Sequence, residues 1–475
     1  MIKNCKRLIC LIIAFALVFS LIGCKNNTGD LSSNDVEYIV EEEYVYVDGE
    51  NNNINNSNNI SANTSDDGST NNNSNGSSYV PFATDPSEFK GTTVKFAVTS
   101  DPMESEKGPV IESFENKYNI KIEPVIIKGD FVTELTGLIA NGNSPDVVRS
   151  SGDFPLSLCY LQSLDTAKID YNDSIWEQAM FNLTTFGGSP YLCSTVGNVY
   201  TEIDIVVYRK DILEQAGCKT PEQYDKEGNW NMDAFFEIGR TCAEKVSGVQ
   251  GCSFVNIDSA LHMTGNSVFK YENGMYSNGI NDSIMDVLSK LSQVKAEGLI
   301  SINATKGIVD GTIAITTHHS YALRKTGAFE DNKDVWSKLG YYYLPSYSES
   351  TKNVQTGIFR GWGIVKGSQN PVAAGIFLRH YLDPSNFDLV GMYISPEASN
   401  FFLRATTIDY NNWNPYFTYG RTNEEIAGID FNNDIYSVIN LDKTQIERKL
   451  SSINTKIDKG CDNLNKYVSQ QIMSH

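Results

Sequence analysis

The stretch Thr93-Val94-Lys95-Phe96-Ala97-Val98 opens the globular part of the chain with an apolar-rich run of strand length. Helical spacing of apolar residues follows over 106–118, and a second strand pattern over 120–127 is interrupted by Pro124. A second helical pattern follows over 131–140 and a third strand pattern over 145–148. This alternation predicts a parallel sheet with right-handed crossovers. Such sheets bind ligands beyond the carboxyl ends of their strands.

Strand and helix patterns continue toward the C-terminus. Strands are expected at 203–208, 311–316 and 341–344, and helices at 232–243, 283–296, 371–381 and 443–467. An aromatic loop is expected at 413–419, and no internal repeat is visible.

The chain has 475 residues, of which 40% are hydrophobic. This length predicts two or three folding units of about 100 to 200 residues each.

The charge balance is strongly acidic. Asp and Glu outnumber Lys and Arg by 58 to 38, which gives a formal net charge of -20. Such a surface repels phosphate backbones, so we expect no nucleic acid partner. No cofactor is expected either, because the sequence has no phosphate-loop motif and no motif of a serine hydrolase or zinc protease.

The first 24 residues carry an export pattern. Three cations precede an apolar run over 8–22, which ends in Leu21-Ile22-Gly23-Cys24. This ending resembles a bacterial lipobox, in which Cys24 would receive lipid with acyl chains such as palmitate and residues 1–23 would be removed as the signal peptide. The alternative is a plain membrane-anchor helix, but a span needs about 20 apolar residues.

Residues 24–80 would then hold the lipidated cysteine and a tether dominated by Asn, Ser, Gly, Asp and Thr. Such a composition buries too little apolar surface to offset its ordering entropy, which predicts disorder. Six further cysteines could form disulfides or remain buried thiols, and none of them forms a Cys-x-x-Cys metal clip. These are Cys159, Cys193, Cys218, Cys242, Cys252 and Cys461.

Several segments together resemble the family of extracellular solute-binding proteins of sugar ABC importers, which includes the maltodextrin binders. They are, in chain order, 94–96, Ser144-Pro145-Asp146-Val147-Val148, 207–213, 311–315, 341–345, Gly361-Trp362-Gly363-Ile364 and 366–371. The sequence departs from the family at Arg209, where Asn is usual, and at His318-His319-Ser320, where relatives often have Asn-Gly-Pro.

The resemblance implies an α/β fold of the periplasmic-binding-protein-like type II, in which two hinged lobes close on a ligand like a clam shell. Lobe 1 would comprise residues 81–193, and lobe 2 would comprise 194–358. Residues 359–475 would return to lobe 1 and add a C-terminal helical region. A monomer is expected, anchored by lipid on the extracellular face of a bacterial, Gram-positive-type membrane and delivering a sugar or oligosaccharide to ABC permease subunits.

The resemblance also suggests ligand-binding residues. Sugars are held by flat aromatic faces and by charged or amide groups that bond hydroxyls. The candidates are Asp101, Asp153, Glu202, Asp258, His262, Tyr321, Arg360 and Trp362. The flanking glycines of Trp362 would allow close backbone approach and expose its ring. The alternatives are a solvated loop carboxylate for each acid, simple packing for Tyr321 and His262, and a hinge salt bridge for Arg360. No catalytic residue is assigned.

Three alternatives remain open at this point. The same clam shell could report to a sensor kinase instead of an importer. A surface carbohydrate-active enzyme would need two carboxylates at a fixed separation, and the acids are spread along the chain without a catalytic signature. A metal-binding lipoprotein is suggested only by His318 and His319, and neighbouring residues of a strand point to opposite faces, so no metal site is expected.

Overall fold

The computed structural model of the chain describes residues 85–105, 107–150, 154–195, 202–255, 257–272, 275–301, 304–348, 355–358, 361–406, 413–416 and 426–473. The predicted signal peptide, Cys24, the tether, Asp153 and Arg360 lie outside these residues. Among the described helices, none is long and apolar enough to span a bilayer.

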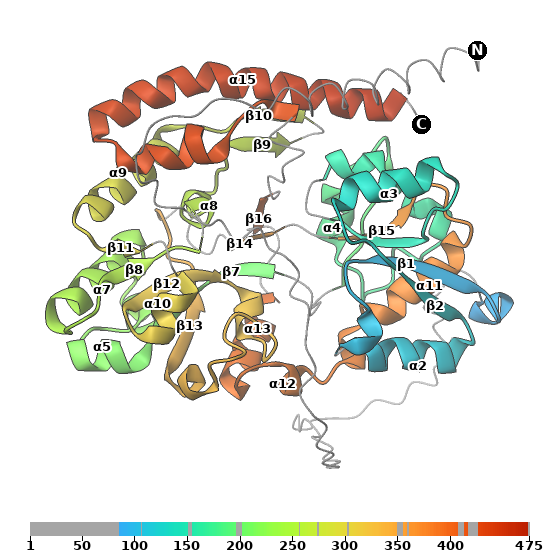
Figure 1. Cartoon of the computed structure of the whole chain (residues 1–475), viewed down its shortest axis with the longest axis horizontal. Helices are drawn as coiled ribbons and strands as arrows, with labels where there is room; N and C mark the ends of the chain where they lie inside the picture. The colour runs from blue at the N-terminus through green and yellow to red at the C-terminus, as the bar shows by residue number, and fades with distance from the viewer. Residues whose placement is uncertain are drawn as a thin grey trace, which may run out of the picture. The chain divides into compact units, whose positions relative to one another are not determined.

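A first sheet has the strand order β2-β1-β3-β15-β4. Figure 1 shows its strands β1, β2 and β15. Its strands are β1 (Thr93–Val98), β2 (Lys121–Ile126), β3 (Val147–Arg149), β4 (Leu161–Gln162) and β15 (Trp362–Val365). β1 pairs in parallel with β2 and β3, and the helices α2 (Gly108–Tyr118) and α3 (Phe131–Ala140) connect these strands. This confirms the predicted strand and helix alternation. β15 enters the sheet antiparallel to β3 and β4 from more than 190 residues later in the chain.

Asp146 ties this returning segment to β3. The carboxylate is buried and accepts hydrogen bonds from Lys95 N at 2.8 Å, Ser368 Oγ at 2.6 Å and Asn370 N at 3.0 Å. Two of the segments that carry the family resemblance, around Asp146 and around Ser368, are therefore in direct contact. Asn370 precedes α11 (Pro371–Tyr381), and its side-chain amide donates to the carbonyl of Thr93 at 3.0 Å without capping the helix. The first residue of α11 is proline, as favoured at a helix start.

A second sheet has the order β11-β8-β12-β7-β14-β16, with β13 also paired to β7. Its strands are β7 (Glu202–Arg209), β8 (Gly251–Ser253), β11 (Ile300–Ser301), β12 (Ile313–His319), β13 (Leu339–Tyr343), β14 (Gln355–Ile358) and β16 (Trp413–Tyr416). The expected aromatic loop at 413–419 is wrong over its first four residues, because β16 pairs in parallel with β14.

Helices with side-chain N-caps surround the second sheet. Asn231 caps α7 (Met232–Lys245) and Asn281 caps α9 (Asp282–Ala296), each by accepting a backbone N–H of the first turn. α5 (Lys210–Ala216) ends at Gly217, which adopts the left-handed conformation that glycine permits. The apolar faces of α7 and α9 are buried in one large core cluster.

The remaining elements are short, with the exception of α13 and α15. They are η1 (Pro86–Phe89), η2 (Pro102–Glu104), η3 (Leu156–Cys159), η4 (Leu164–Ala167), α4 (Gln178–Leu183), β5 (Thr185–Phe186), β6 (Ser189–Pro190), α6 (Pro221–Lys226), α8 (Ile257–His262), β9 (Phe269–Glu272), β10 (Met275–Asn278), α10 (Ala304–Asp310), η5 (Ser320–Leu323), η6 (Lys333–Lys338), η8 (Pro384–Asn386), α12 (Leu389–Met392), α13 (Pro396–Thr406), η10 (Phe431–Ile435), η11 (Tyr436–Asn440) and α15 (Lys443–Met473).

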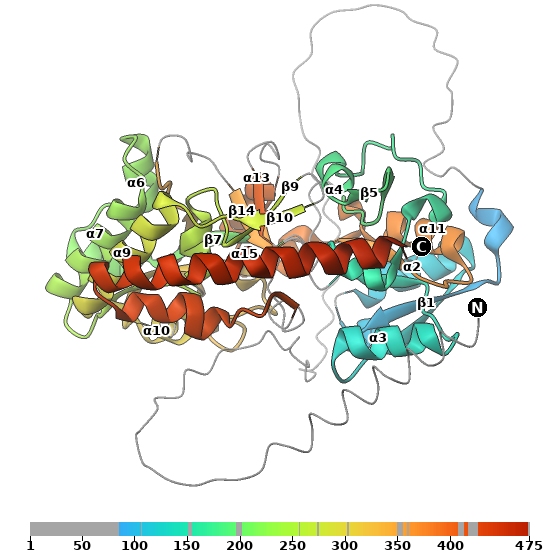
Figure 2. The same ribbon diagram turned by 90° about the horizontal axis from the view of Figure 1, so that it is seen from above.

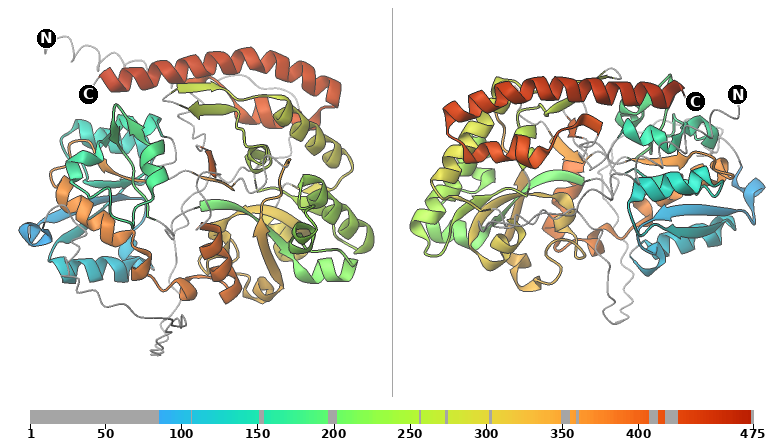
Figure 3. Two further views of the ribbon diagram at one scale, coloured as in Figure 1. Left: turned by 180° about the vertical axis from the view of Figure 1, so that it is seen from behind. Right: turned by 45° about the horizontal axis from the view of Figure 1, so that its top comes forward.

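The long terminal helix α15 runs beside the β9–β10 hairpin in each view (Figures 2 and 3). It buries an apolar stripe at steps of three and four residues, as expected for one face of a helix. The stripe consists of Ile446, Leu450, Ile453, Ile457, Cys461, Leu464 and Val468. Asn465 pairs its side-chain amide with both backbone groups of Tyr276 on β10, at 2.7 Å and 2.9 Å. The expected helix at 443–467 is confirmed and is six residues longer.

Each sheet has apolar clusters of its own. β1, α2 and α11 share one cluster, whereas β7, α7, α9 and α15 share another. The predicted boundaries of the two lobes, at residues 81, 194 and 359, stay a prediction, since they fall in or beside stretches outside the described residues.

Candidate functional site

An ion pair links the two sheets. Arg149 is the last residue of β3, and its Nη2 lies 3.0 Å from Oε1 of Glu202, the first residue of β7. Both side chains are largely buried, and the Arg149 guanidinium lies 6.0 Å from the centre of the Trp362 ring. The carboxyl end of a parallel strand is where α/β sheets bind ligands. We therefore take this contact as the centre of the candidate site.

Asp101 lies in the turn after β1, at the same edge of the first sheet as Arg149, because β1 and β3 are parallel. Its Oδ1 accepts the backbone N–H of Met103 at 2.9 Å and so caps η2. The carboxylate is partly exposed, so its second oxygen can accept a hydroxyl group. This position is compatible with the predicted role of Asp101 in binding.

Trp362 is placed differently from what its flanking glycines suggested. Its side chain is only 2% exposed and packs against Phe96 and Tyr381, with ring centres 5.7 Å and 5.3 Å apart. Added Cβ atoms at Gly361 or Gly363 would collide with Leu192 or Leu161. The glycines therefore allow close packing of the strand and do not expose the ring. The Trp362 ring lies beside the Arg149 guanidinium. Its faces are covered by protein, so no ligand can stack on it in this structure.

Tyr321 lies in η5, directly after β12, and is partly exposed. Its ring lies nearly parallel to His319, with centres 6.2 Å apart, and edge-on to His318, with centres 5.4 Å apart. Tyr321 follows His319 by two residues, and Glu202 precedes Asp204 by two. Because β7 and β12 are antiparallel and Asp204 is paired with His319, both predicted binding residues lie at the same end of this strand pair.

The two adjacent histidines have different hydrogen-bond partners. His319 Nδ1 lies 2.8 Å from Asp204 Oδ1, while His318 Nε2 lies 3.0 Å from Thr305 Oγ1. His318 Nδ1 accepts the backbone N–H of His319, so the proton of this ring resides on Nε2. Burial, reinforced by the neighbouring His319, lowers the pKa of His318 to about 3, which keeps it neutral.

The other two candidates lie in or at the end of α8. His262 is buried, and burial lowers its pKa to about 3, although the charge of Asp204 opposes this shift. Asp258 is partly exposed and accepts a hydrogen bond from the hydroxyl of Tyr436 at 2.5 Å. Asp258 therefore keeps an accessible side chain for binding, whereas His262 belongs to the buried layer beneath the site.

Arg209, where the family usually has Asn, has a structural role. Its guanidinium binds both oxygens of Asp211 and donates to the carbonyl of Ile308 at 2.9 Å. Among the described residues, no three His, Cys, Asp or Glu side chains are close enough together to hold a metal ion.

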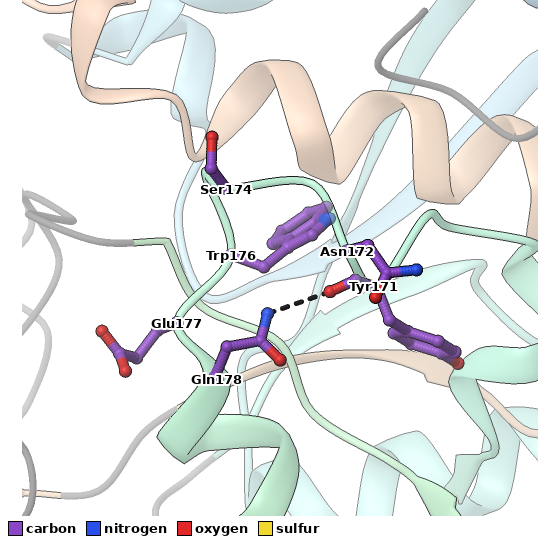
Figure 4. A pocket seen from close by; sticks show the side chains of 6 residues that line it. All are labelled: Tyr171, Asn172, Ser174, Trp176, Glu177 and Gln178. Atoms are coloured by element: carbon purple, nitrogen blue, oxygen red, sulfur yellow. Dashed lines mark hydrogen bonds between the residues drawn. The ribbon is translucent and has the colours of Figure 1, made fainter.

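A surface hollow of about 450 Å³ lies elsewhere, in the loop before α4 (Figure 4). Its lining consists of Tyr171, Asn172, Ser174, Trp176, Glu177 and Gln178. The Trp176 ring is almost fully covered by its neighbours, and burial raises the pKa of Glu177. The hollow contains none of the predicted binding residues.

Sequence reasoning missed Arg149 and Asp204. Arg149 directly follows the predicted strand at 145–148, and a charged residue at the carboxyl end of a parallel strand could have been noticed. Asp204 interrupts the apolar run of β7, where a charge in a central strand is itself unusual. Neither partner could be identified from the sequence, because both contacts join residues more than 50 positions apart.

Comparison with solved structures identifies the fold as the two-lobed α/β fold of solute-binding proteins. An ABC substrate-binding protein of Listeria monocytogenes in complex with cycloalternan is 14% identical, with a TM-score of 0.56 over 77% of this chain and 99% of that one. The cyclic alpha-maltosyl-1,6-maltose binding protein of Arthrobacter globiformis is 12% identical, with a TM-score of 0.55 over 80% and 99%. Maltose-bound MalE3 of T. maritima is 15% identical, with a TM-score of 0.54 over 81% and 100%.

The sequence itself matches a family profile described as bacterial extracellular solute-binding protein over residues 97–386, more than half of the chain. The chain therefore belongs to this family of extracellular binding proteins. No curated protein matches the sequence. The resemblance inferred from the sequence segments is confirmed.

Proposed function

We propose that the protein captures a neutral sugar or oligosaccharide between its two lobes and delivers it to an ABC importer, without changing the sugar chemically. The ligand would contact both lobes only when they close, so binding would shift the population toward the closed form. The importer's permease subunits would then recognise that form. The protein acts as a monomer. Lobe 1 comprises residues 81–193 and the segment that rejoins it from residue 359, and lobe 2 comprises residues 194–358.

The observation that carries this proposal is the contact between Arg149 and Glu202, at 3.0 Å. It joins a strand end of one sheet to a strand end of the other. Asp101 follows β1 at the same end of the first sheet as Arg149, and Tyr321 follows β12 at the same end of the second sheet as Glu202. Carboxylates accept several hydroxyl hydrogens and an aromatic ring stacks on a sugar ring. Asp153 and Arg360, which lie outside the described residues, complete the proposed set.

The choice of carbohydrate draws on the similar structures. One is in complex with cycloalternan, one is named for binding cyclic alpha-maltosyl-1,6-maltose, and one is bound to maltose. A highly anionic ligand fits less well with a chain of net charge -20.

The test is a thermal-shift screen of the purified full chain against maltose, maltotriose, cyclic glucans, lacto-N-biose and matched peptides and uronates. A molecule that binds only the folded chain raises the melting temperature by mass action. We expect at least one neutral oligosaccharide to raise it, and Glu202→Gln to remove most of that rise. A shift produced only by peptides or uronates would reject the carbohydrate ligand. Formation of a new sugar product during incubation would instead support an enzyme.

Lipidation of Cys24 is tested separately. After processing, Cys24 would be the first residue and residues 24–80 a flexible tether with a span on the order of 40 Å. We expect labelled palmitate to be incorporated into the parent protein and not into Cys24→Ala, with sugar binding unchanged. A parent protein that stays in the membrane fraction without incorporating the label would indicate a plain membrane-anchor helix instead.

A further inference from the structure

Asp204 and His319 form a buried pair at the end of the β7 and β12 strand pair where Glu202 and Tyr321 also lie. The two residues stand opposite each other in the antiparallel register of β7 and β12, and His319 Nδ1 lies 2.8 Å from Asp204 Oδ1. The Asp204 side chain is completely buried and that of His319 is 5% exposed. Neither side chain is thus placed to contact a solute itself.

Polarity increases along one face of this strand pair toward the site. The opposed residues change from Tyr208 and Ile315, through Val206 and Thr317, to Asp204 and His319. An apolar pair would fill the last position at lower cost, because burying a carboxylate and an imidazole sacrifices their hydration. A buried polar pair in a core strand is therefore more readily explained by a role in orienting a neighbouring side chain than by a contribution to the stability of the fold.

The pair orients an aromatic residue of the site. The imidazole of His319 lies 30° from parallel to the ring of Tyr321, and the backbone N–H of His319 fixes His318, whose ring meets Tyr321 edge-on. Thr305 holds the other nitrogen of His318. Tyr321 consequently rests against two imidazoles whose rotations are each set by a hydrogen bond.

We infer that Asp204 and His319 are positioning residues, which set the orientation of Tyr321 as the stacking platform for a sugar ring. This inference rests on the proposed function. The hydrogen bond to Asp204 fixes the imidazole plane of His319, and that plane determines how the Tyr321 ring lies. The pair acts through Tyr321 and makes no contact with the sugar.

The first experiment needs no sugar. The full chain is labelled with 3-fluorotyrosine, and the ¹⁹F NMR signal of Tyr321 is identified by its loss in Tyr321→Phe. We expect the signal to move or broaden in the double variant Asp204→Leu/His319→Leu and to stay in place in Thr317→Val. Thr317 is the matched control because it lies on the same face of β12, one pair away, and its hydroxyl accepts the N–H of Val255. An unmoved Tyr321 signal in the double variant overturns the inference.

The second experiment measures maltotriose affinity and melting temperature together. Replacing a buried polar pair by leucines leaves the melting temperature unchanged or higher, since apolar replacement of such pairs is often neutral or stabilising. We expect the double variant to bind maltotriose about tenfold more weakly despite this. Asp204→Asn, which can still accept from His319, should stay within about threefold of the parent. Thr317→Val should lower the melting temperature and leave the affinity intact.

A double-mutant cycle shows whether the pair acts through Tyr321. In a Tyr321→Ala background, the leucine double variant should cause no further loss of maltotriose affinity. An undiminished tenfold loss in that background would mean that the pair acts by another route and would reject the inference. If the parent protein binds another oligosaccharide of the thermal-shift screen in place of maltotriose, that sugar is used in both affinity experiments. If it binds none of them, that result counts against the proposed function, and the fluorine experiment alone decides the positioning role.

Discussion

Arg149 and Glu202 form a 3.0 Å ion pair that joins the end of a parallel strand in one sheet to the start of β7 in the other. Each side chain is less than one fifth exposed, so solvent screens the pair only weakly. One of the acids assigned to ligand binding is therefore held in place by a cation from the opposite lobe. A sugar that binds Glu202 must do so beside this guanidinium.

We predict that Glu202→Gln lowers the free energy of unfolding by about 1–3 kcal/mol, because Arg149 loses its charged partner in a largely buried position. Chemical denaturation measures this loss. Lys121→Met is the matched control, since Lys121 pairs with Glu115 at 3.1 Å but is 67% exposed, and it should cost less than about 1 kcal/mol. Equal losses in both variants would contradict the burial argument.

Trp362 should behave as a core residue. Trp362→Ala is expected to lower the free energy of unfolding by about 3–5 kcal/mol, because the substitution leaves a cavity between Phe96 and Tyr381. Trp362→Phe fills most of that space and should retain sugar affinity within about threefold. Denaturation curves and titration calorimetry separate the two effects. A stable Trp362→Phe variant that no longer binds sugar would restore a direct stacking role.

Acidification should destabilise the protein through His262 and His318, whose pKa values burial lowers to about 3. Below about pH 6.5 these imidazoles take up protons in the unfolded chain and not in the folded chain. Their contribution is fully present above that pH and is lost as the pH falls toward the folded pKa, at ~1.4 kcal/mol per pH unit for each group. Urea unfolding between about pH 7 and about pH 5 measures the slope, which His318→Gln should make shallower. An unchanged slope in that variant would show that His318 titrates normally in the folded chain.

The cysteines of the folded part should be thiols. All six of the cysteines from Cys159 to Cys461 are free in the structure, although the sulfurs of Cys218 and Cys242 are 3.6 Å apart. Burial raises the pKa of the Cys242 thiol, which disfavours the thiolate that would attack another sulfur. Unfolding without reductant, alkylation and peptide mass analysis should find six labelled cysteines. A linked pair of peptides containing Cys218 and Cys242 would contradict this prediction.

The regular spacing of apolar residues was enough to predict those helices and strands that form mainly through local interactions. Thr93–Val98, Phe131–Ala140 and Pro371–Tyr381 have the bounds expected from the sequence. Pro124 did not break its strand, because β2 lies at the edge of the first sheet and a missing N–H is tolerated there. By contrast, 413–416 was expected to be a loop. Its strand pairing depends on β14, more than 50 residues away, and local propensity does not specify such a partner.

In the candidate site, too, some features were predicted from the sequence and others depend on distant contacts that the sequence does not specify. Glu202 and Tyr321 were predicted from the resemblance, and the structure brings them to one end of the β7 and β12 pair. The ring of Trp362 was expected to be exposed by its glycine neighbours, yet those glycines serve the contacts with Leu161 and Leu192. Glycine allows close approach of either a ligand or another backbone, and the sequence does not distinguish between them.

The amide of Asn465 has a consequence for solubility. A two-stranded hairpin such as β9–β10 leaves backbone N–H and carbonyl groups unpaired along its outer edges, where a strand from another molecule can pair with them. Asn465 of α15 satisfies both the N–H and the carbonyl of Tyr276, at the middle of β10. The terminal helix thereby blocks the position at which a foreign strand would begin to pair, and it protects the hairpin against aggregation.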